Sequence, residues 1–134
     1  LKYNIPPLVC VGEKKFNTNF NLRKQGLRKK LNIFLKNISL KKNKKIIFAY
    51  EPIWAIGKSK SANLKYIAET IDFIKVFSQK KLKINKNQLN VIYGGSVNKE
   101  NAINILNIKN NDGIFIGRSA ISAKDFLDIC KMTL

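Results

Sequence analysis

The stretch from residue 46 to residue 62, IIFAYEPIWAIGKSKSA, decides the expected fold class. It opens on residues 46–50, an apolar run with no polar residue before Glu51. A run that is apolar on both faces predicts a buried strand of a parallel sheet. Glu51 stands at the tip of that strand, and Pro52 prevents the strand from simply continuing. Because parallel α/β folds carry their chemistry at the carboxyl ends of the strands, Glu51 is a candidate catalytic residue.

The segment that follows, residues 52–62, has the composition of a lid. It contains an aromatic residue, Trp54, a glycine, Gly57, and small hydroxyl residues before a helical pattern begins. Apolar loops that are hinged at both ends close over active sites and exclude water. We therefore expect a lid directly after the strand that Glu51 ends.

Outward from this stretch, the chain alternates between strand and helix patterns. Short apolar runs predict strands at residues 8–11, 46–50, 89–93 and 114–116. Apolar residues at helical spacing follow each run: Leu27, Leu31, Phe34, Leu35 and Ile38; Ile67, Ile71, Ile74 and either Val76 or Phe77; Ala102, Ile103, Ile105 and Leu106; Phe126, Leu127, Ile129 and Cys130. Asn98 is the expected N-cap of the third helix, and Ser122 with Asp125 resembles a capping box. The sequence thus predicts four strand–helix units with parallel strands.

Four such units fit two architectures, an open doubly wound sheet or part of a (β/α)₈ barrel. The first would be favoured by a GxGxxG motif, which the sequence lacks. The second is favoured by the glycines after the last two predicted strands, Gly94-Gly95 and Gly117, because phosphate groups bind at these loops in such barrels. The same glycines are equally consistent with plain tight turns.

Composition and charge restrict the function classes. The chain has 134 residues, enough for one domain with a modest core. Its 26 Lys and Arg against 8 Asp and Glu give a net charge of +18, which raises the question of nucleic-acid binding. The lysines are spread along the chain, with Lys-rich segments at 41–45 and 80–86, and no nucleic-acid-binding motif accompanies them. We interpret the charge as compositional skew and expect no dedicated nucleic-acid binding.

The cysteines and the apolar segments indicate where the protein is located and whether it binds a metal. Cys10 and Cys130 are too few for a disulfide framework and form no metal-binding pattern, and Cys10 is expected to be a small buried residue. Residues 1–4 lack the apolar core of a secretory signal, and no stretch reaches the ~20 apolar residues of a membrane span. We therefore expect a cytoplasmic protein with no membrane partner and no metal. Because the sequence opens without Met, we also expect a piece of a longer protein.

Four segments resemble signature segments of the triosephosphate isomerase family: PLVCVGE at 7–13, AYEPIWAIG at 49–57, YGGSV at 93–97 and DGIFIGRSA at 112–120. Their order and spacing agree with the family from about Pro7 to the end of the chain. A barrel of this kind needs about 250 residues. The resemblance therefore implies the C-terminal half of a TIM barrel, strands five to eight, with residues 1–134 forming one partial domain.

The resemblance also implies roles for individual residues. Glu51 matches the family's catalytic base, which moves a proton between adjacent carbons through an enediol or enediolate. Glu13 and Cys10 match supporting positions. The implied phosphate-binding residues are Gly57, Ser96, Gly117 and Arg118, and the implied lid and latch residues are Pro52, Ile53, Trp54, Ala55, Ile56, Lys58, Ser59, Lys60, Ser61, Ala62 and Tyr93.

The chain departs from the family's pattern within these segments. The family's lid usually continues Gly-Thr-Gly-Lys, whereas here the sequence is Gly57-Lys58-Ser59-Lys60. Ser59 would restrict any positive φ needed at that position, and Lys58 adds charge near the phosphate. Arg118 stands where the family often has Gly, although its backbone N–H is retained.

The function that the resemblance implies is the interconversion of dihydroxyacetone phosphate and D-glyceraldehyde 3-phosphate in glycolysis and gluconeogenesis. It implies no cofactor, and a homodimer for the complete enzyme. The family also uses a His from its fourth strand and a Lys from its first, and this chain has no His and lacks the matching strands. We therefore expect an N-terminal half-barrel as a necessary partner and activity near background without it. The alternative is a catalytically inactive phosphate-binding half-barrel or an interaction protein.

Overall fold

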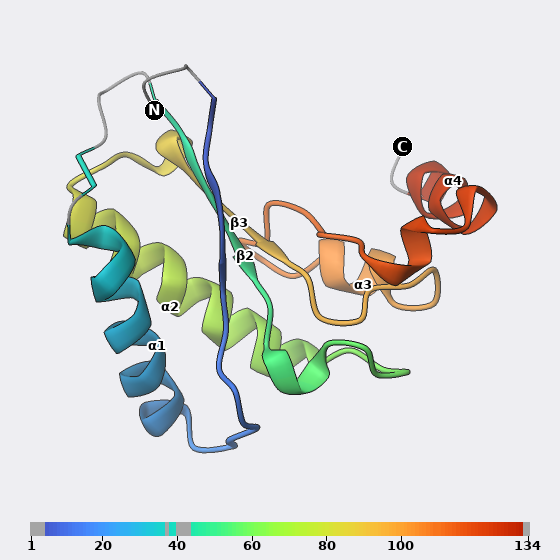
Figure 1. Cartoon of the computed structure of the whole chain (residues 1–134), viewed down its shortest axis with the longest axis horizontal. Coiled ribbons are helices and arrows are strands. Elements are labelled where there is room, and N and C mark those ends of the chain that lie inside the picture. Colours follow the sequence, from blue (N-terminus) through green and yellow to red (C-terminus); the bar gives the residue numbers. More distant parts are fainter. Residues whose placement is uncertain (1–4, 37, 40–43, 133–134) are drawn as a thin grey trace.

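The structure is a computed structural model that describes residues 5–36, 38–39 and 44–132. Within these residues β1 (Leu8–Val11), β2 (Ile46–Tyr50) and β3 (Leu89–Tyr93) form a parallel sheet in the order β1-β2-β3 (Figure 1). The register places the last residues of the three strands in one row. The first three predicted strands and the α/β class are therefore confirmed. Of the predicted Lys-rich connection at 41–45, residues 41–43 lie outside the described residues.

Two long helices, α1 (Phe20–Leu35) and α2 (Leu64–Leu82), pack against each other along the sheet (Figure 1). Each begins after an asparagine whose side chain accepts hydrogen bonds from backbone N–H groups of the first turn, Asn19 for α1 and Asn63 for α2. Most of the apolar residues that predicted these helices form the core with the strands, and the buried ones are Leu27, Leu31, Leu35, Ile67, Ile71 and Ile74. Phe34 and Val76 are exposed instead, and Ile38 lies beyond the end of α1. The helical spacing in the sequence therefore identified both helices and their buried sides.

The two faces of the sheet differ in burial. Side chains of a strand alternate between faces, and Phe48 and Val91, on the face that packs with the helices, are completely buried. On the opposite face Leu8 is 42% exposed, and Cys10 is exposed as well. Parallel sheets are normally covered on both faces. The described part of the chain therefore leaves an apolar sheet face partly open.

The prediction of a fourth strand at residues 114–116 is wrong. Ile114 forms a single parallel bridge with Tyr93, through hydrogen bonds from the Tyr93 N–H to the Gly113 carbonyl (3.1 Å) and from the Phe115 N–H to the Tyr93 carbonyl (2.8 Å). The ladder does not continue, because the chain turns at Gly117 into a short 3₁₀ helix, Arg118–Ala120. An apolar run becomes a strand only when enough of its backbone pairs with neighbours.

The last two helices are short, and their caps differ in part from the predictions. In α3 (Ala102–Leu106) the cap residue is Asn101, whereas the Asn98 side chain accepts hydrogen bonds in the preceding turn, so the predicted N-cap is wrong by three positions. In α4 (Ala123–Met132) the Ser122 hydroxyl accepts a hydrogen bond from the Asp125 N–H at 3.2 Å, which confirms Ser122 as the cap. Both helices lie beyond β3 (Figure 1).

Candidate active site

Glu51 follows β2 directly and stands at the carboxyl end of the sheet. Its N–H donates to the Val11 carbonyl at 2.9 Å, and the Gly94 N–H donates to the Tyr50 carbonyl at 2.9 Å, so the three strand tips are tied together. A Cβ added to Gly94 would lie 2.7 Å from the Cγ of Glu51. The Glu51 side chain therefore lies against the backbone of the next strand tip, where only glycine leaves it room.

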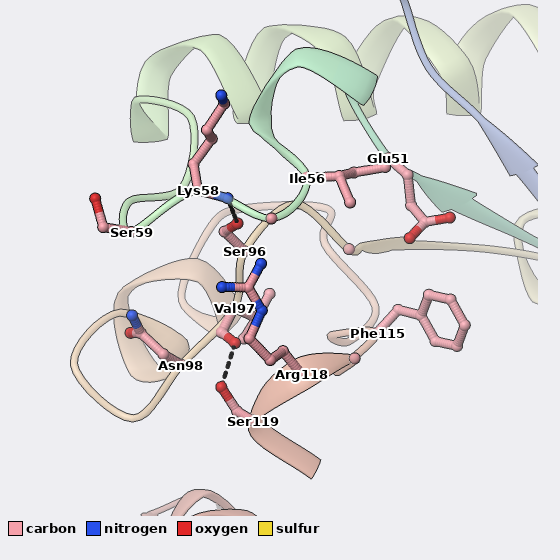
Figure 2. A pocket seen from close by; sticks show the side chains of 13 residues that line it. Glu51, Ile56, Lys58, Ser59, Ser96, Val97, Asn98, Phe115, Arg118 and Ser119 are labelled. Carbon is pink, nitrogen blue, oxygen red and sulfur yellow. Dashed lines mark hydrogen bonds between the residues drawn. The ribbon is translucent and has the colours of Figure 1, made fainter. Parts of the chain in front are cut away.

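A cavity of about 370 Å³ opens beside Glu51 (Figure 2). It brings together eight of the residues that the sequence proposed for the site: Glu51, Ile56, Gly57, Lys58, Ser59, Ser96, Gly117 and Arg118. Of the remaining lining residues, Gly94 belongs to a glycine turn that the sequence already favoured as a phosphate-binding loop, and Asn98 was expected only as a helix cap. The sequence gave no site role to the other three, Val97, Phe115 and Ser119. These thirteen residues come from three separate loops at the strand tips, so the cavity exists only in the folded chain.

The predicted lid, residues 52–62, is held down near both ends by hydrogen bonds. The Ser96 hydroxyl accepts from the Lys58 N–H at 3.0 Å (Figure 2) and donates to the Ala55 carbonyl at 2.7 Å. The Tyr93 hydroxyl accepts from the Ala62 N–H at 3.0 Å. The structure therefore has the lid in a latched arrangement, while the roles of these residues in binding and catalysis stay predictions.

Several lid residues lie outside the cavity. Ile53 lines a neighbouring apolar hollow of about 360 Å³ that also borders Glu51, and Lys60 and Ser61 line a shallow hollow beside Asn98. The remaining residues of the predicted lid and latch that do not line the cavity are Pro52, Trp54, Ala55, Ala62 and Tyr93. Ser96 therefore both lines the cavity and holds the lid, whereas Tyr93 holds the lid without lining the cavity.

Backbone geometry resolves one departure from the family's pattern. Among the described residues other than glycine, only Lys83, Ser96 and Asn110 have positive φ, so Ser59 is not strained in this arrangement. Gly57 does adopt φ +71°, a conformation that favours glycine. Ser96, at φ 52°, is the residue that carries the strain at the site.

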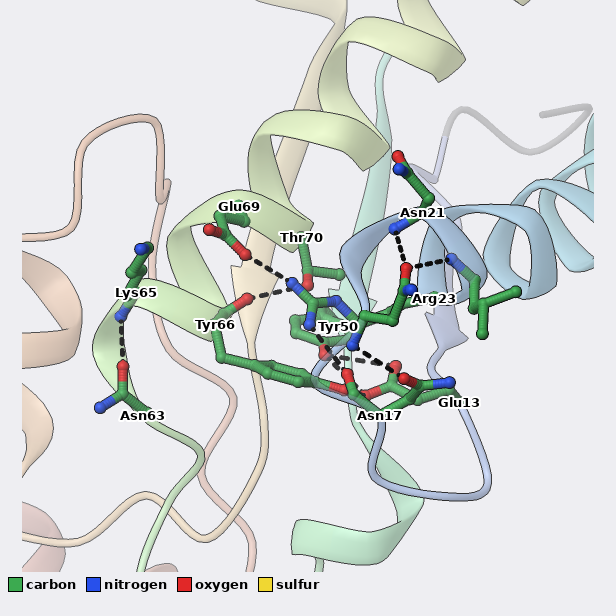
Figure 3. Close-up of polar contacts among 12 residues, drawn as sticks. Glu13, Asn17, Asn21, Arg23, Tyr50, Asn63, Lys65, Tyr66, Glu69 and Thr70 are labelled. Carbon is green, nitrogen blue, oxygen red and sulfur yellow. Dashed lines mark hydrogen bonds and ion pairs between the residues drawn. The ribbon is translucent and has the colours of Figure 1, made fainter.

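Glu13 contacts the first hinge of the lid, where the resemblance implied only a supporting position. Its carboxylate accepts hydrogen bonds from the Tyr50 hydroxyl at 3.0 Å, from the Trp54 indole N–H at 2.8 Å and from the Tyr66 hydroxyl at 2.7 Å. Figure 3 shows Glu13 facing Tyr50 and Tyr66. Because Trp54 belongs to the lid and Tyr66 to α2, this carboxylate joins the hinge to the helical layer.

Arg23 completes this cluster from α1, and the sequence gave no signal for it. It is 3% exposed, pairs with Glu69 at 2.8 Å, and its guanidinium lies 3.6 Å from the centre of the Tyr66 ring (Figure 3). Burial and then the hydrogen bond to Glu13 raise the pKa of Tyr66 to about 12. Burial and the Glu13 charge also raise the pKa of Tyr50 above its ordinary value. Both hydroxyls therefore stay protonated as donors to Glu13 at neutral pH.

Cys10 is exposed, so the expectation of a buried residue is wrong. It lies on β1, on the partly open face of the sheet, and lines the apolar hollow that also borders Glu51. Partial burial and the neighbouring Glu51 carboxylate raise the pKa of its thiol to about 11. The thiol is therefore a neutral neighbour of Glu51 near pH 7 rather than a nucleophile.

The raised tyrosine pKa values predict a loss of stability in alkaline solution. Burial raises the pKa of Tyr93 from 10.0 to about 12. Between these values the folded state keeps a proton that the unfolded state releases, so this contribution is full below pH 10.0 and is lost as pH rises through about 12. We expect the free energy of unfolding from urea titrations to fall over this range, and to fall less steeply in Tyr93→Phe. Wild type and variant lose the same lysine charges, so equal slopes would contradict the prediction.

Within the described residues, no three His, Cys, Asp or Glu side chains are grouped so that they could hold a metal ion. In the same part of the chain, no helix combines the length and the apolar character needed to cross a membrane.

Parallel strands whose carboxyl ends meet at a cavity with a glycine-lined wall define an α/β protein with a candidate site at the strand tips. A model of the triosephosphate isomerase family matches residues 1–133. The chain therefore belongs to the triosephosphate isomerase family, a family of isomerases, as the resemblance of its segments predicted.

Individual relatives agree with this assignment. The triosephosphate isomerase of Mycoplasma mobile is 38% identical over 131 residues, which are 98% of this chain and 50% of that protein. Triosephosphate isomerase 2 of Listeria innocua serovar 6a is 38% identical over 129 residues, 96% of this chain and 50% of that protein. The triosephosphate isomerase of Francisella tularensis subsp. mediasiatica is 39% identical over 126 residues, 93% of this chain and 49% of that protein. This chain therefore spans about half the length of these relatives.

Proposed function

We propose that this chain is the C-terminal half of a triosephosphate isomerase barrel, with residues 1–134 as one partial domain that supplies strands five to eight. Two observations support the proposal: the chain spans about half of its relatives, and one face of its parallel sheet is partly open. In a closed barrel that face points inward and is covered by the other strands. Among the described residues β1 ends the sheet with no further strand beside it, and such an edge invites association.

The reaction that the site supports best is the interconversion of dihydroxyacetone phosphate and D-glyceraldehyde 3-phosphate. The single observation that carries this proposal is the position of Glu51, which borders the cavity at the tip of β2. A carboxylate there removes a proton from one carbon of the substrate and returns it to the adjacent carbon. Closure of a lid strips water from a carboxylate and makes it a stronger base.

The rest of the cavity suits a phosphate group. Backbone N–H groups of Gly57, Gly117 and Arg118 would donate to its oxygens, and glycine lets the backbone come close to the ligand. Ile56, on the lid and at the cavity wall, would shield the enediolate from water. In this assignment the lid binds the phosphate and also keeps water away from the enediolate.

The remaining machinery has to come from outside this chain. The pairing of a Glu base with a neutral His and a Lys is the family's, and the sequence contains no His. We propose that the N-terminal half-barrel supplies both groups, and that the complete enzyme is a cytoplasmic glycolytic homodimer. Without that half, the chain is a phosphate-binding half-barrel with no electrophile.

An isomerase assay tests this proposal. The chain is assayed alone and after fusion to the N-terminal half of the Mycoplasma mobile relative, with that half alone as the control. We expect activity near background for either part and an increase of at least about 10²-fold in the fusion, because positioned catalytic groups contribute on this scale. Substantial turnover by the chain alone would contradict the need for the His and Lys. A folded but inactive fusion would favour the alternative, a non-catalytic phosphate-binding half-barrel.

A further inference from the structure

The side chain of Arg118, and not only its backbone N–H, lies close to the lid. A Cβ added to Gly57 would lie 3.0 Å from Nη2 of Arg118. Figure 2 shows the Arg118 side chain extending from the start of the 3₁₀ helix Arg118–Ala120 towards Ser96 and the lid. The guanidinium therefore lies inside the candidate phosphate cavity, at the point where lid and loop meet.

Among the described residues, no carboxylate forms an ion pair with the Arg118 guanidinium. The ion pairs among the described residues join Arg23 to Glu69, Lys75 to Asp112 and Lys99 to Asp125, and none of them engages Arg118. The cavity wall carries two cations, Lys58 and Arg118, against the single acid Glu51. A cavity with this balance attracts an anion.

We propose that the Arg118 guanidinium binds the substrate phosphate directly, in addition to the backbone N–H groups of the loops. This inference rests on the proposed function for the identity of the phosphate, which is that of a triose phosphate. A guanidinium presents a planar fork of N–H donors that matches two phosphate oxygens at once, whereas an ammonium acts as a point charge. Because Nη2 also lies close to Gly57, a phosphate held by Arg118 would connect the 3₁₀ helix Arg118–Ala120 to the closed lid.

The test is a titration of the chain with inorganic phosphate at about 0.15 M salt, where unspecific charge effects are largely screened. Binding is followed through the backbone amide signals of Gly57 and Gly117 in ¹H–¹⁵N spectra, which also report whether each variant is folded. Arg118→Gln removes the guanidinium, and Arg118→Lys keeps the charge without the fork. Lys124→Gln is the matched control, because it removes the same charge from an exposed residue of α4 that does not line the cavity.

We expect Arg118→Gln to weaken phosphate binding by about 10- to 100-fold, as for the loss of hydrogen bonds to a charged group. Arg118→Lys should recover part of the affinity, and Lys124→Gln should bind like wild type. Equal affinities for wild type and Arg118→Gln, equal losses in Arg118→Gln and Lys124→Gln, or no binding by wild type would each overturn the inference. Binding that depends on Arg118 in a chain whose fusion has no isomerase activity would support this inference and overturn the proposed function.

Discussion

Glu51→Gln is expected to lower kcat of the reconstituted isomerase by about 10²–10⁴-fold, the range that a positioned general base contributes. Glutamine keeps the size of the side chain but cannot accept a proton from carbon. Since Glu51 is not among the proposed phosphate ligands, KM should change little, which is the pattern of an interaction made in the transition state. Steady-state rates of the fusion protein in both directions of the reaction would measure the effect.

The control for Glu51→Gln is Asp72→Asn, which removes an exposed acid of α2 that does not line the cavity. Its kcat should match that of wild type, and an unchanged kcat in Glu51→Gln would remove Glu51 from the role of base.

A second measurement on Glu51→Gln does not depend on catalysis. Because the Glu51 carboxylate contributes to the raised pKa of Cys10, Glu51→Gln should speed alkylation of Cys10 near pH 8. Unchanged alkylation would mean that the carboxylate does not face the thiol.

The parts of the fold that could be predicted from the sequence are those whose apolar residues follow a regular spacing and pack into one core. Residues 46–50 are apolar throughout because β2 is the central strand and its side chains are buried or half-buried on both faces. The stripes at Leu27 and Leu31 and at Ile67 and Ile71 point to one core. The run at 114–116 carries the same apolar signal but forms one bridge only. Apolar composition records a tendency to be buried, whereas a strand also needs backbone partners, which the sequence alone does not place.

The candidate site also contains features that the sequence predicted and features that it did not. The positions of Glu51 at the tip of β2 and of residues 52–62 beside the cavity were predictable because these residues are contiguous in the chain and carry a specific motif. The hydrogen bonds that converge on Glu13 were not, since Tyr50, Trp54 and Tyr66 belong to β2, the lid and α2 and meet Glu13 only in the folded chain. The exposure of Cys10 was also missed, because an apolar strand is buried only where some other element covers it.

Gly12→Ala is expected to have the largest effect on stability of any glycine substitution in this chain. A Cβ at Gly12 would lie 1.8 Å from the carbonyl oxygen of Glu51, 2.4 Å from its carbonyl carbon and 2.9 Å from the nitrogen of Pro52. These are backbone atoms at the junction of β2 and the lid, so no side chain can rotate to relieve the contact. We expect the free energy of unfolding to fall by roughly 3 kcal/mol, the upper part of the usual range for overpacking. Urea unfolding of the chain, followed by circular dichroism, would measure it.

The matched control is Gly26→Ala, because the same methyl group added at Gly26 meets no atom within 4 Å. Gly26 lies inside α1, where alanine is favoured over glycine, so this variant should gain about 0.5–1 kcal/mol. In the fusion protein, Gly12→Ala should also lower kcat by about 10²-fold even where it stays folded, since a shift of about 1 Å in a catalytic group costs this much. A Gly12→Ala variant as stable and as active as Gly26→Ala would show that the tips of β1 and β2 lie further apart than in this structure. Glu51 would then lose the close backbone contact that fixes its position.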